Sequence, residues 1–362
     1  MSTLLYVAAG AVSLYVIVYY AVFRGVRCVS SVKLKGKTAI VTGSNTGIGK
    51  ATALDLAKRG ARVILACRNK EKAEAASFDI RRESGNNDVV FMQLDLASLK
   101  SVSSFAETFL KTEPRLDILI NNAGEDVEIR WNIPFLSLQH QLYLTSLLHC
   151  SETTISDLSS FLVYTLCSGV MGPGRTEDGF GLALGVNHLG HFLLTNLLLE
   201  RLQQCGPSRV ITVAALLHRF GKIDFPLLAS KKDLVSGQST WHNFQAYCNS
   251  KLCNVLFTRE LANRLEGTSV TCYSLHPGVI YTEICRSLSF WQQLLIMPFA
   301  KLFFMDPEGG SQTTLYCALQ EGIEPLSGRY FSNCALQQVG AKGRDDALAK
   351  KLWEVSERLT FH

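Results

Sequence analysis

The sequence has few of the features that mark metal-binding or disulfide-bonded proteins. Its 362 residues include eleven cysteines, but no two of them form a Cys-x-x-Cys unit. Zinc sites and disulfide frameworks need cysteines at regular paired spacings, so we expect neither, and no metal site. Cysteines such as Cys67, Cys248 and Cys272 fall in apolar segments, which indicates small buried side chains in a reducing compartment.

An excess of charge of one sign is also missing. The 36 basic and 31 acidic residues give a net charge of only +5, and no basic run is interleaved with aromatic residues. This pattern predicts no nucleic-acid partner. Hydrophobic residues make up 47% of the chain, which is enough for one large core and leaves room for a membrane segment.

One long apolar run is present, from Leu4 to Phe23. Its twenty residues are enough to cross a bilayer as a helix. No charged residue precedes it, and five basic residues follow: Arg24, Arg27, Lys33, Lys35 and Lys37. The positive-inside rule therefore predicts a membrane anchor over residues 1–23, with the body of the protein in the cytosol. We expect the membrane to be that of the endoplasmic reticulum. Residues 24–35 are expected to form a basic juxtamembrane linker beside anionic headgroups.

Two other interpretations of this run exist. A cleaved signal peptide would make the protein secreted, but basic residues before the run and a small-residue cleavage site near Phe23 are missing. A buried helix of a soluble protein would normally show a polar face, and this run has none.

A glycine-rich turn follows the linker. Residues 37–42 are typical of a short buried strand, and residues 50–59 of a helix that ends at Gly60. Between them lie Gly43, Ser44, Asn45, Thr46, Gly47, Ile48 and Gly49. Glycines let the backbone approach a pyrophosphate, and the helix N-terminus stabilises its charge. The context predicts a dinucleotide site, although a tight turn without a ligand is the alternative.

The next strand, residues 61–67, bears on the choice of cofactor. Where NAD binds such folds, an acidic residue near the end of this strand holds the ribose hydroxyls. Here Cys67 takes that place and Arg68 follows; Lys50 is a second candidate cation. A guanidinium pairs with a 2′-phosphate that a carboxylate would repel, so NADP(H) is expected rather than NAD(H). An ordinary surface arginine is the alternative.

Two further strands add candidates for the cofactor site. Residues 89–94 predict a strand followed by Asp95 and Leu96, where a carboxylate could accept from an adenine amino group, and a helix then runs to Leu110. Residues 116–120 predict another buried strand. Its end carries Asn121, Asn122, Ala123 and Gly124.

Together with Tyr247-Cys-Asn-Ser-Lys251, these motifs resemble the short-chain dehydrogenase/reductase family. The segments 185–192 and 276–279 are similar to its membrane-anchored retinol dehydrogenase branch. The resemblance covers about residues 36–340 and implies an α/β fold of Rossmann type, a doubly wound parallel sheet of about seven strands. Residues 341–362 would then form a C-terminal helix or tail.

The resemblance also implies the roles of several residues. Tyr247 would be the acid/base, and Lys251 would bind the nicotinamide ribose and lower the tyrosine pKa. Tyrosine ordinarily titrates near pH ~10, so it needs a nearby cation at neutral pH, and residues four apart share a helix face. Asn187 would order a proton-relay water. Pro277, Gly278 and Thr282 would form the nicotinamide-side loop.

The chain departs from the family pattern in its catalytic serine. The segment 209–218 is predicted as the strand that carries it, and Ala215 stands at its position. Ala214 has no hydroxyl, and alternation along a strand would point Thr212 to the other face. A lost oxyanion donor typically costs about two to three decades in rate. Three hypotheses follow. The chain is a weak enzyme, it uses a water in place of the serine, or it is a cofactor-binding pseudoenzyme.

A second departure is an atypical insert over residues 125–169, about 45 residues longer than the family pattern allows. Joining Gly124 directly to Val170 gives an ordinary family sequence, which suggests a retained intron or a gene-model error. A true insertion, such as a membrane-contacting loop, is the alternative. If the segment is present in the protein, it would emerge beside the cofactor and could block the active site.

The apolar stretch from Glu283 to Met305 is expected to form a substrate lid. On a membrane-anchored enzyme it fits a hydrophobic small-molecule substrate, a lipophilic alcohol or carbonyl such as retinol or retinal. Core or dimer packing is the alternative explanation, so the sequence leaves a homodimer open.

Overall fold

The structure is a computed structural model, and it describes residues 25–124, 174–229, 240–278, 280 and 305–361. The predicted anchor, the insert at 125–169, Thr282 and nearly all of the predicted lid lie outside the described residues.

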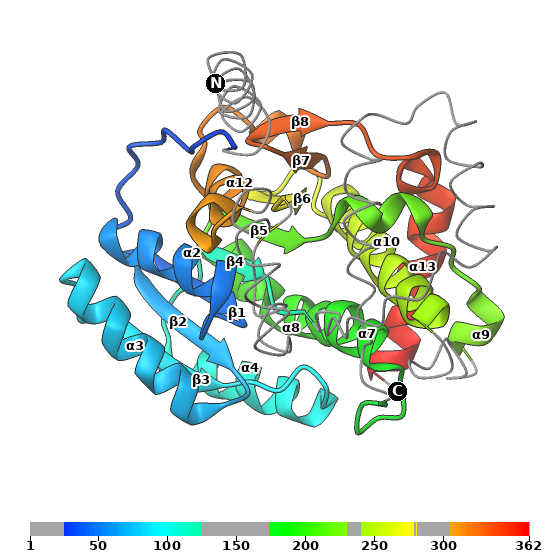
Figure 1. The fold of residues 1–362 in the computed structure, drawn as a ribbon, viewed down its shortest axis with the longest axis horizontal. Helices are drawn as coiled ribbons and strands as arrows, with labels where there is room; N and C mark the ends of the chain where they lie inside the picture. Colours follow the sequence, from blue (N-terminus) through cyan, green and yellow to red (C-terminus); the bar gives the residue numbers. More distant parts are fainter. Residues whose placement is uncertain (1–24, 125–173, 230–239, 279, 281–304, 362) are drawn as a thin grey trace, which may run out of the picture.

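The fold is built on one sheet of eight strands in the order β3-β2-β1-β4-β5-β6-β7-β8 (Figure 1). The strands are β1 (Thr38–Thr42), β2 (Arg62–Cys67), β3 (Val89–Gln93), β4 (Ile118–Asn121), β5 (Ser208–Val213), β6 (Val270–His276), β7 (Tyr330–Ser332) and β8 (Ala335–Gln337). Strands β1 to β7 are parallel, and β8 pairs antiparallel with β7. The predicted doubly wound sheet of about seven parallel strands is confirmed, with β8 as an addition.

Helices cover both faces of this sheet. They are α2 (Gly47–Lys58), α3 (Lys70–Ser84), α4 (Leu99–Thr112), α7 (Leu182–Leu184), α8 (His191–Gln204), α9 (Phe225–Ala229), α10 (Thr240–Arg264), α12 (Pro307–Leu319) and α13 (Asp346–Phe361). The shorter turns are η2 (Gly185–Gly190), η3 (Leu216–Phe220), η5 (Glu324–Leu326) and η6 (Ala341–Arg344). Helices α2, α3 and α12 share one core with the sheet, and α4, α8 and α10 share the other (Figure 1).

Burial on both faces explains why the central strands are apolar throughout. Every residue of β1 and β4 is buried, and so is all of β2 except its first residue. Strands of a parallel sheet covered on both sides have no solvent face, so their sequences do not alternate between apolar and polar residues.

The strand predicted over 209–218 is shorter in the structure. Strand β5 ends at Val213, and residues 216–220 form the 3₁₀ turn η3. The apolar residues that extend the strand pattern pack instead on α10, where Ala215 and Leu217 lie against Cys248. The turn is closed by His218, whose Nδ1 is 2.7 Å from the carbonyl oxygen of Ala215.

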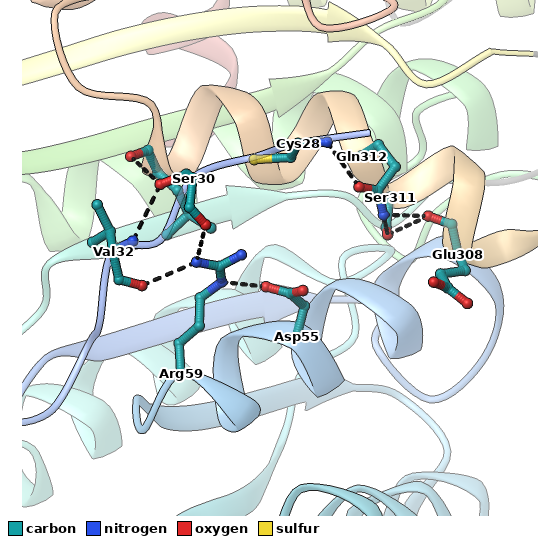
Figure 2. Close-up of polar contacts among 9 residues, drawn as sticks. Cys28, Ser30, Val32, Asp55, Arg59, Glu308, Ser311 and Gln312 are labelled. Carbon is teal, nitrogen blue, oxygen red and sulfur yellow. Dashed lines mark hydrogen bonds and ion pairs between the residues drawn. The ribbon is translucent and has the colours of Figure 1, made fainter. Parts of the chain in front are cut away.

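The residues predicted as a linker run along the outside of the domain. We call residues 25–34 the strap. Its side chains alternate: Cys28, Ser30, Val32 and Leu34 are at least partly buried, whereas Arg27, Val29, Ser31 and Lys33 are exposed. Figure 2 shows Arg59, the residue that caps the C-terminus of α2, donating to the carbonyl oxygens of Ser30 and Val32. The two distances are 2.7 and 3.0 Å.

The strap also contacts α12 and the β7–β8 turn. The Cys28 amide donates to Gln312 at 3.0 Å, and the Val26 amide donates to Asn333 at 2.7 Å. Two of the four basic residues that the structure describes here are ion-paired: Arg27 with Glu308 and Lys37 with the buried Asp117. The strap is therefore bonded to the domain along its length.

Among the described residues, one helical stretch, Leu182–Gln204, is long and apolar enough to cross a membrane. Its most apolar window is 78% buried inside the protein, so it is a core helix of the domain. The predicted N-terminal span lies outside the described residues.

Candidate active site

The glycine turn between β1 and α2 has the shape that a pyrophosphate requires. Gly43 and Gly47 have φ values of +63° and +57°, which L side chains rarely adopt. A Cβ on Gly49 would lie 2.4 Å from the carbonyl oxygen of Gly43, so only glycine permits this close packing. Thr46 makes no side-chain cap, and the first turn of α2 has no acidic residue. These residues fit a bound dinucleotide phosphate.

The turn is locked to the end of β4 through Thr42. The Thr42 hydroxyl accepts hydrogen bonds from the amides of Asn122 and Ala123, both at 2.9 Å. The side-chain amide of Asn122 donates back to the Thr42 carbonyl oxygen at 2.9 Å. The two segments that the sequence assigned to the cofactor therefore form one unit.

The end of β2 carries no acid near this turn. Cys67 is buried, with its sulfur 3.6 Å from the Ser44 hydroxyl, and burial raises the pKa of its thiol. Arg68 is exposed immediately after it. Lys50, the second candidate cation, forms an ion pair with Asp79 of α3 at 2.7 Å.

Asp95 and Leu96 follow β3, at the same sheet edge. One carboxylate oxygen of Asp95 accepts from the Ala97 amide at 2.9 Å, which fixes the side chain. Leu96 is buried, and a Cβ on Gly190 would lie 2.7 Å from its carbonyl oxygen. This segment therefore packs directly on the turn η2.

Helix α10 carries the predicted acid/base pair. The Nζ of Lys251 lies 5.4 Å from the centroid of the Tyr247 ring. The lysine is only 5% exposed, and it donates to the carbonyl oxygen of Val213, at the end of β5, at 3.3 Å. The four-residue spacing thus places both side chains on the helix face toward the sheet edge.

Asn187 joins this pair from the π-helical turn η2. It is fully buried, and its Nδ2 donates to the Ser250 hydroxyl at 3.0 Å. Ser250 in turn donates to the Tyr247 carbonyl oxygen at 2.8 Å. A Cβ on Gly124 would lie 3.3 Å from Asn187 Oδ1 and 3.6 Å from Lys251 Nζ. The Asn-Asn-Ala-Gly segment therefore meets the predicted catalytic residues.

Ala215 also lies at this site. Its backbone is extended, with φ −155° and ψ 160°, and its side chain shares a small buried cluster with Leu217 and Cys248, against which Tyr247 packs. The hydroxyl of Thr212 is buried in β5 and makes no hydrogen bond within the described part of the chain. No hydroxyl is thus contributed by residues 213–215 beside Tyr247.

The nicotinamide-side loop begins at the end of β6. Gly278 has φ +98°, and a Cβ there would lie 2.8 Å from Met305 Sδ. Ile280 forms a bridge with Met305, and its side chain approaches Gly310, which also neighbours Ile48 of the glycine turn. Pro277 precedes this contact region, whereas Thr282 lies outside the described residues.

Three side chains that the sequence analysis did not assign support the site. Thr42 and His191 lie in contact, with Oγ1 and Nε2 2.9 Å apart. Asn254, three residues after Lys251, donates to the same Val213 carbonyl oxygen at 3.2 Å. The spacing of His191 and Asn254 from the motif residues by one helical turn could have indicated a shared face.

Comparisons with known proteins agree with this geometry. A doubly wound parallel sheet with this glycine turn defines a dinucleotide-binding protein of Rossmann type. The sequence model of the family described as short chain dehydrogenase matches residues 37–162. The chain belongs to the short-chain dehydrogenase/reductase family, and its nicotinamide dinucleotide cofactor and oxidoreductase chemistry follow from that membership.

Two curated relatives illustrate the relationship. Dehydrogenase/reductase SDR family member 13 of Bos taurus is 49% identical over 95% of this chain and 78% of its own length. Retinol dehydrogenase 11 of Mus musculus is 44% identical over 91% of this chain and 88% of its own length. Among solved structures, an uncharacterized protein from Mycobacterium paratuberculosis has a TM-score of 0.63 at 30% identity, and the match covers 93% of this chain and 98% of that one.

Proposed function

We propose that this chain is an NADP(H)-dependent oxidoreductase that interconverts a lipophilic alcohol and its carbonyl, of the retinol and retinal kind. The observation that carries the proposal is the meeting of Tyr247, Lys251 and Gly124 at one sheet edge, beside the glycine turn. The bound nicotinamide would supply or accept the hydride. Its pyrophosphate would be held by residues 43–49, and its nicotinamide half by Lys251 and the Pro277–Gly278 loop.

The proton chemistry belongs to the residues of α10. In the reductive direction Tyr247 gives its proton to the carbonyl oxygen, and in the oxidative direction it takes the alcohol proton back. The Lys251 ammonium beside the ring stabilises the tyrosinate that forms. Asn187 fixes the backbone of this helix turn through Ser250, which keeps the tyrosine aligned with its lysine.

The preference for NADP(H) rests on charge at the end of β2. The buried Cys67 thiol is neutral, and exposed Arg68 can form a bidentate pair with a 2′-phosphate. Arg68 directly follows β2 and is exposed there, so it is the residue to vary. In fluorescence titrations we expect Arg68→Asp to weaken NADPH binding at least about tenfold and to change NADH binding little. Equal weakening of both cofactors, or of neither, would reject the assignment.

The substrate class follows from the apolar stretch around residues 283–305 and from the names of the relatives, which include retinol dehydrogenases 11 and 12. The site would face the cytosol from the endoplasmic reticulum membrane. The test is turnover of all-trans-retinal with NADPH by the full-length chain in detergent or nanodiscs, with Tyr247→Phe as the inactive control. Equal rates for the wild-type chain and Tyr247→Phe would refute the proposed enzymatic function.

Ala215 favours a second candidate, an NADP(H)-binding pseudoenzyme. The place beside Tyr247 where the family has a hydroxyl holds a methyl group. This candidate predicts tight NADPH binding by the wild-type chain without measurable turnover.

A further inference from the structure

The buried ring of His191 joins Thr42, at the start of the glycine turn, to η2, the turn that carries Asn187. It is the first residue of α8 and only 1% exposed. Its Nε2 lies 2.9 Å from the Thr42 hydroxyl, and its Nδ1 lies 3.1 Å from the main-chain carbonyl oxygen of Asn187. The imidazole thus makes one hydrogen bond at each ring nitrogen.

The hydrogen-bond capacity of Thr42 fixes the direction of the first bond. A hydroxyl has one proton and two lone pairs. The amides of Asn122 and Ala123 both donate to Thr42 Oγ1, so both lone pairs are used. The proton must therefore point to an acceptor, and His191 Nε2 at 2.9 Å is closer than the carbonyl oxygen of Ile120 at 3.4 Å. Nε2 accepts, and it carries no proton.

The second bond selects the same form of the ring. A carbonyl oxygen can only accept, so His191 Nδ1 must carry the proton that meets Asn187. Both ends thus require the neutral imidazole with its proton on Nδ1. Burial, helped by the charge of Lys251, lowers the pKa of His191 to about 4 despite the opposing bond to Asn187.

We propose that His191 is a positioning residue, which holds Asn187 in place through its main-chain carbonyl as a neutral, Nδ1-protonated imidazole. The hydrogen bonds around His191 all run in the same donor-to-acceptor direction. The amides of residues 122 and 123 donate to Thr42, Thr42 donates to His191, and His191 donates to Asn187. Separately, the side-chain amide of Asn187 donates to Ser250, and Ser250 donates to the Tyr247 carbonyl oxygen. In the first part, Thr42 and His191 each accept and donate, so these bonds strengthen one another.

The chain connects the glycine-turn side of the site with the helix of the acid/base. Its role in catalysis rests on the proposed function, whereas the form of the ring does not. The first test therefore reads the tautomer directly, by ¹⁵N NMR of the full-length protein labelled at histidine. The His191 signals are assigned by their loss in His191→Asn.

We expect a protonated Nδ1 and an unprotonated Nε2, unchanged between about pH 5.5 and 8. A proton on Nε2, or an imidazolium at neutral pH, would overturn the proposal whether or not the chain turns over a substrate.

The second test measures steady-state kinetics with NADPH binding. His191→Leu removes both bonds, and we expect kcat to fall by about tenfold to a hundredfold while KM and the NADPH Kd change less than about threefold. In His191→Asn the side-chain amide can still donate to Asn187, so this variant should recover most of kcat.

His188→Leu is the matched control. His188 is also buried, but its Nε2 lies 2.8 Å from Ser356 of α13, away from the site. It should lose thermal stability and keep kcat. Equal kcat losses at both positions, or no recovery in His191→Asn, would make His191 a packing residue only. A wild-type chain without turnover would refute the proposed enzyme instead, and the tautomer would then decide this inference alone.

Discussion

The methyl group of Ala215 lies against the cluster that Tyr247 packs on, where one added oxygen needs little space. We predict that Ala215→Ser raises kcat by up to about two decades, because a hydroxyl there would polarise the substrate oxygen beside the tyrosine. The measurement is steady-state reduction of retinal with NADPH by the full-length chain.

Ala214→Ser is the control for this substitution. Ala214 is equally small and buried, but it packs in a different cluster with Val255 and Tyr330. A serine there should not raise kcat. If both variants have wild-type rates, the missing hydroxyl does not limit the reaction.

Two buried histidines make the stability of the domain depend on pH. Burial lowers the pKa of His188 to about 3 and of His191 to about 4, whereas an unfolded histidine titrates near ~6.5. Below pH ~6.5 the unfolded chain takes up protons that the folded chain does not, so the stability is fully present above this pH and is lost as the pH falls. Each histidine should cost about 2 kcal/mol between pH ~6.5 and 5.

Urea unfolding at several pH values measures this effect. His188→Leu should remove its own share of the slope, although it lowers stability at neutral pH. A variant with the slope of the wild-type chain would contradict the neutral, buried state of His188.

At the scale of elements, the strap is an extended segment bonded to the C-terminal end of α2, the helix that follows the glycine turn. Arg59 is mostly buried and holds it with two bonds, to Ser30 and Val32, while Asp55 fixes the guanidinium (Figure 2). We predict that Arg59→Met releases the strap at a cost of roughly 1–3 kcal/mol, because two partly buried carbonyl oxygens lose their charged donor. In hydrogen exchange of the full-length protein, the amides of Val26 and Cys28 should exchange at least about tenfold faster.

Arg82→Met serves as the control in the same experiment. Arg82 is exposed on α3, where it contacts only Asp79 and the ring of Phe78 in the described part of the chain. Its loss should not alter exchange in the strap. Unchanged exchange in Arg59→Met would show that the remaining contacts hold the segment without the arginine.

The strap and η3 show where sequence patterns stop predicting elements. Strands β1 to β4 were predicted within one or two residues. For β1, β2 and β4 the reason is that a buried strand must be apolar along nearly its whole length. The apolar run after Val213 has the same composition, yet it turns at Ala215 to pack on α10, a contact between distant residues. The sequence predicts a basic juxtamembrane linker here because the outward residues of the strap carry the charge, and it gives no sign of the bonds that the strap makes with the domain.

The residues of the site that belong to sequence motifs were predictable from the sequence. The glycine turn, Tyr247 and Lys251 are recognisable from local spacing, and the structure brings them to one sheet edge. The bonds of His191 depend on residues 42 and 187, which meet only after the sheet has formed. A buried histidine that neither binds a metal nor titrates near neutrality leaves no separate pattern in the sequence.

At the scale of the whole molecule, helix α13 completes the core on the α8 and α10 side. Trp353 packs on Phe192 and Phe257, with ring centroids 4.9 and 5.8 Å apart, and Arg264 lies over its ring. The expected C-terminal helix is thus a structural part of the domain and packs on α10, with Asp346 paired to Arg259 at its start. The elements around the site are held from both ends of the chain.

Removing the segment that begins at residue 125 tests whether the chain can bind its cofactor and turn over a substrate while this segment is present. Gly124 lies against Asn187 and Lys251, so the next residues start beside the proposed nicotinamide site. We predict that deleting residues 125–169, which joins Gly124 to Val170, tightens NADPH binding at least about tenfold and raises retinal turnover, on the hypothesis that a segment attached at Gly124 competes with the cofactor for space.

The comparison needs a third chain, in which a Gly/Ser linker of equal length replaces residues 125–169. Loop closure alone changes stability little at this length, so a linker chain that binds like the deletion would assign the effect to the sequence of the segment. A linker chain that binds like the wild type would assign it to bulk at Gly124. If all three chains bind NADPH equally, the segment leaves the site open, and a true insertion becomes the better explanation of residues 125–169.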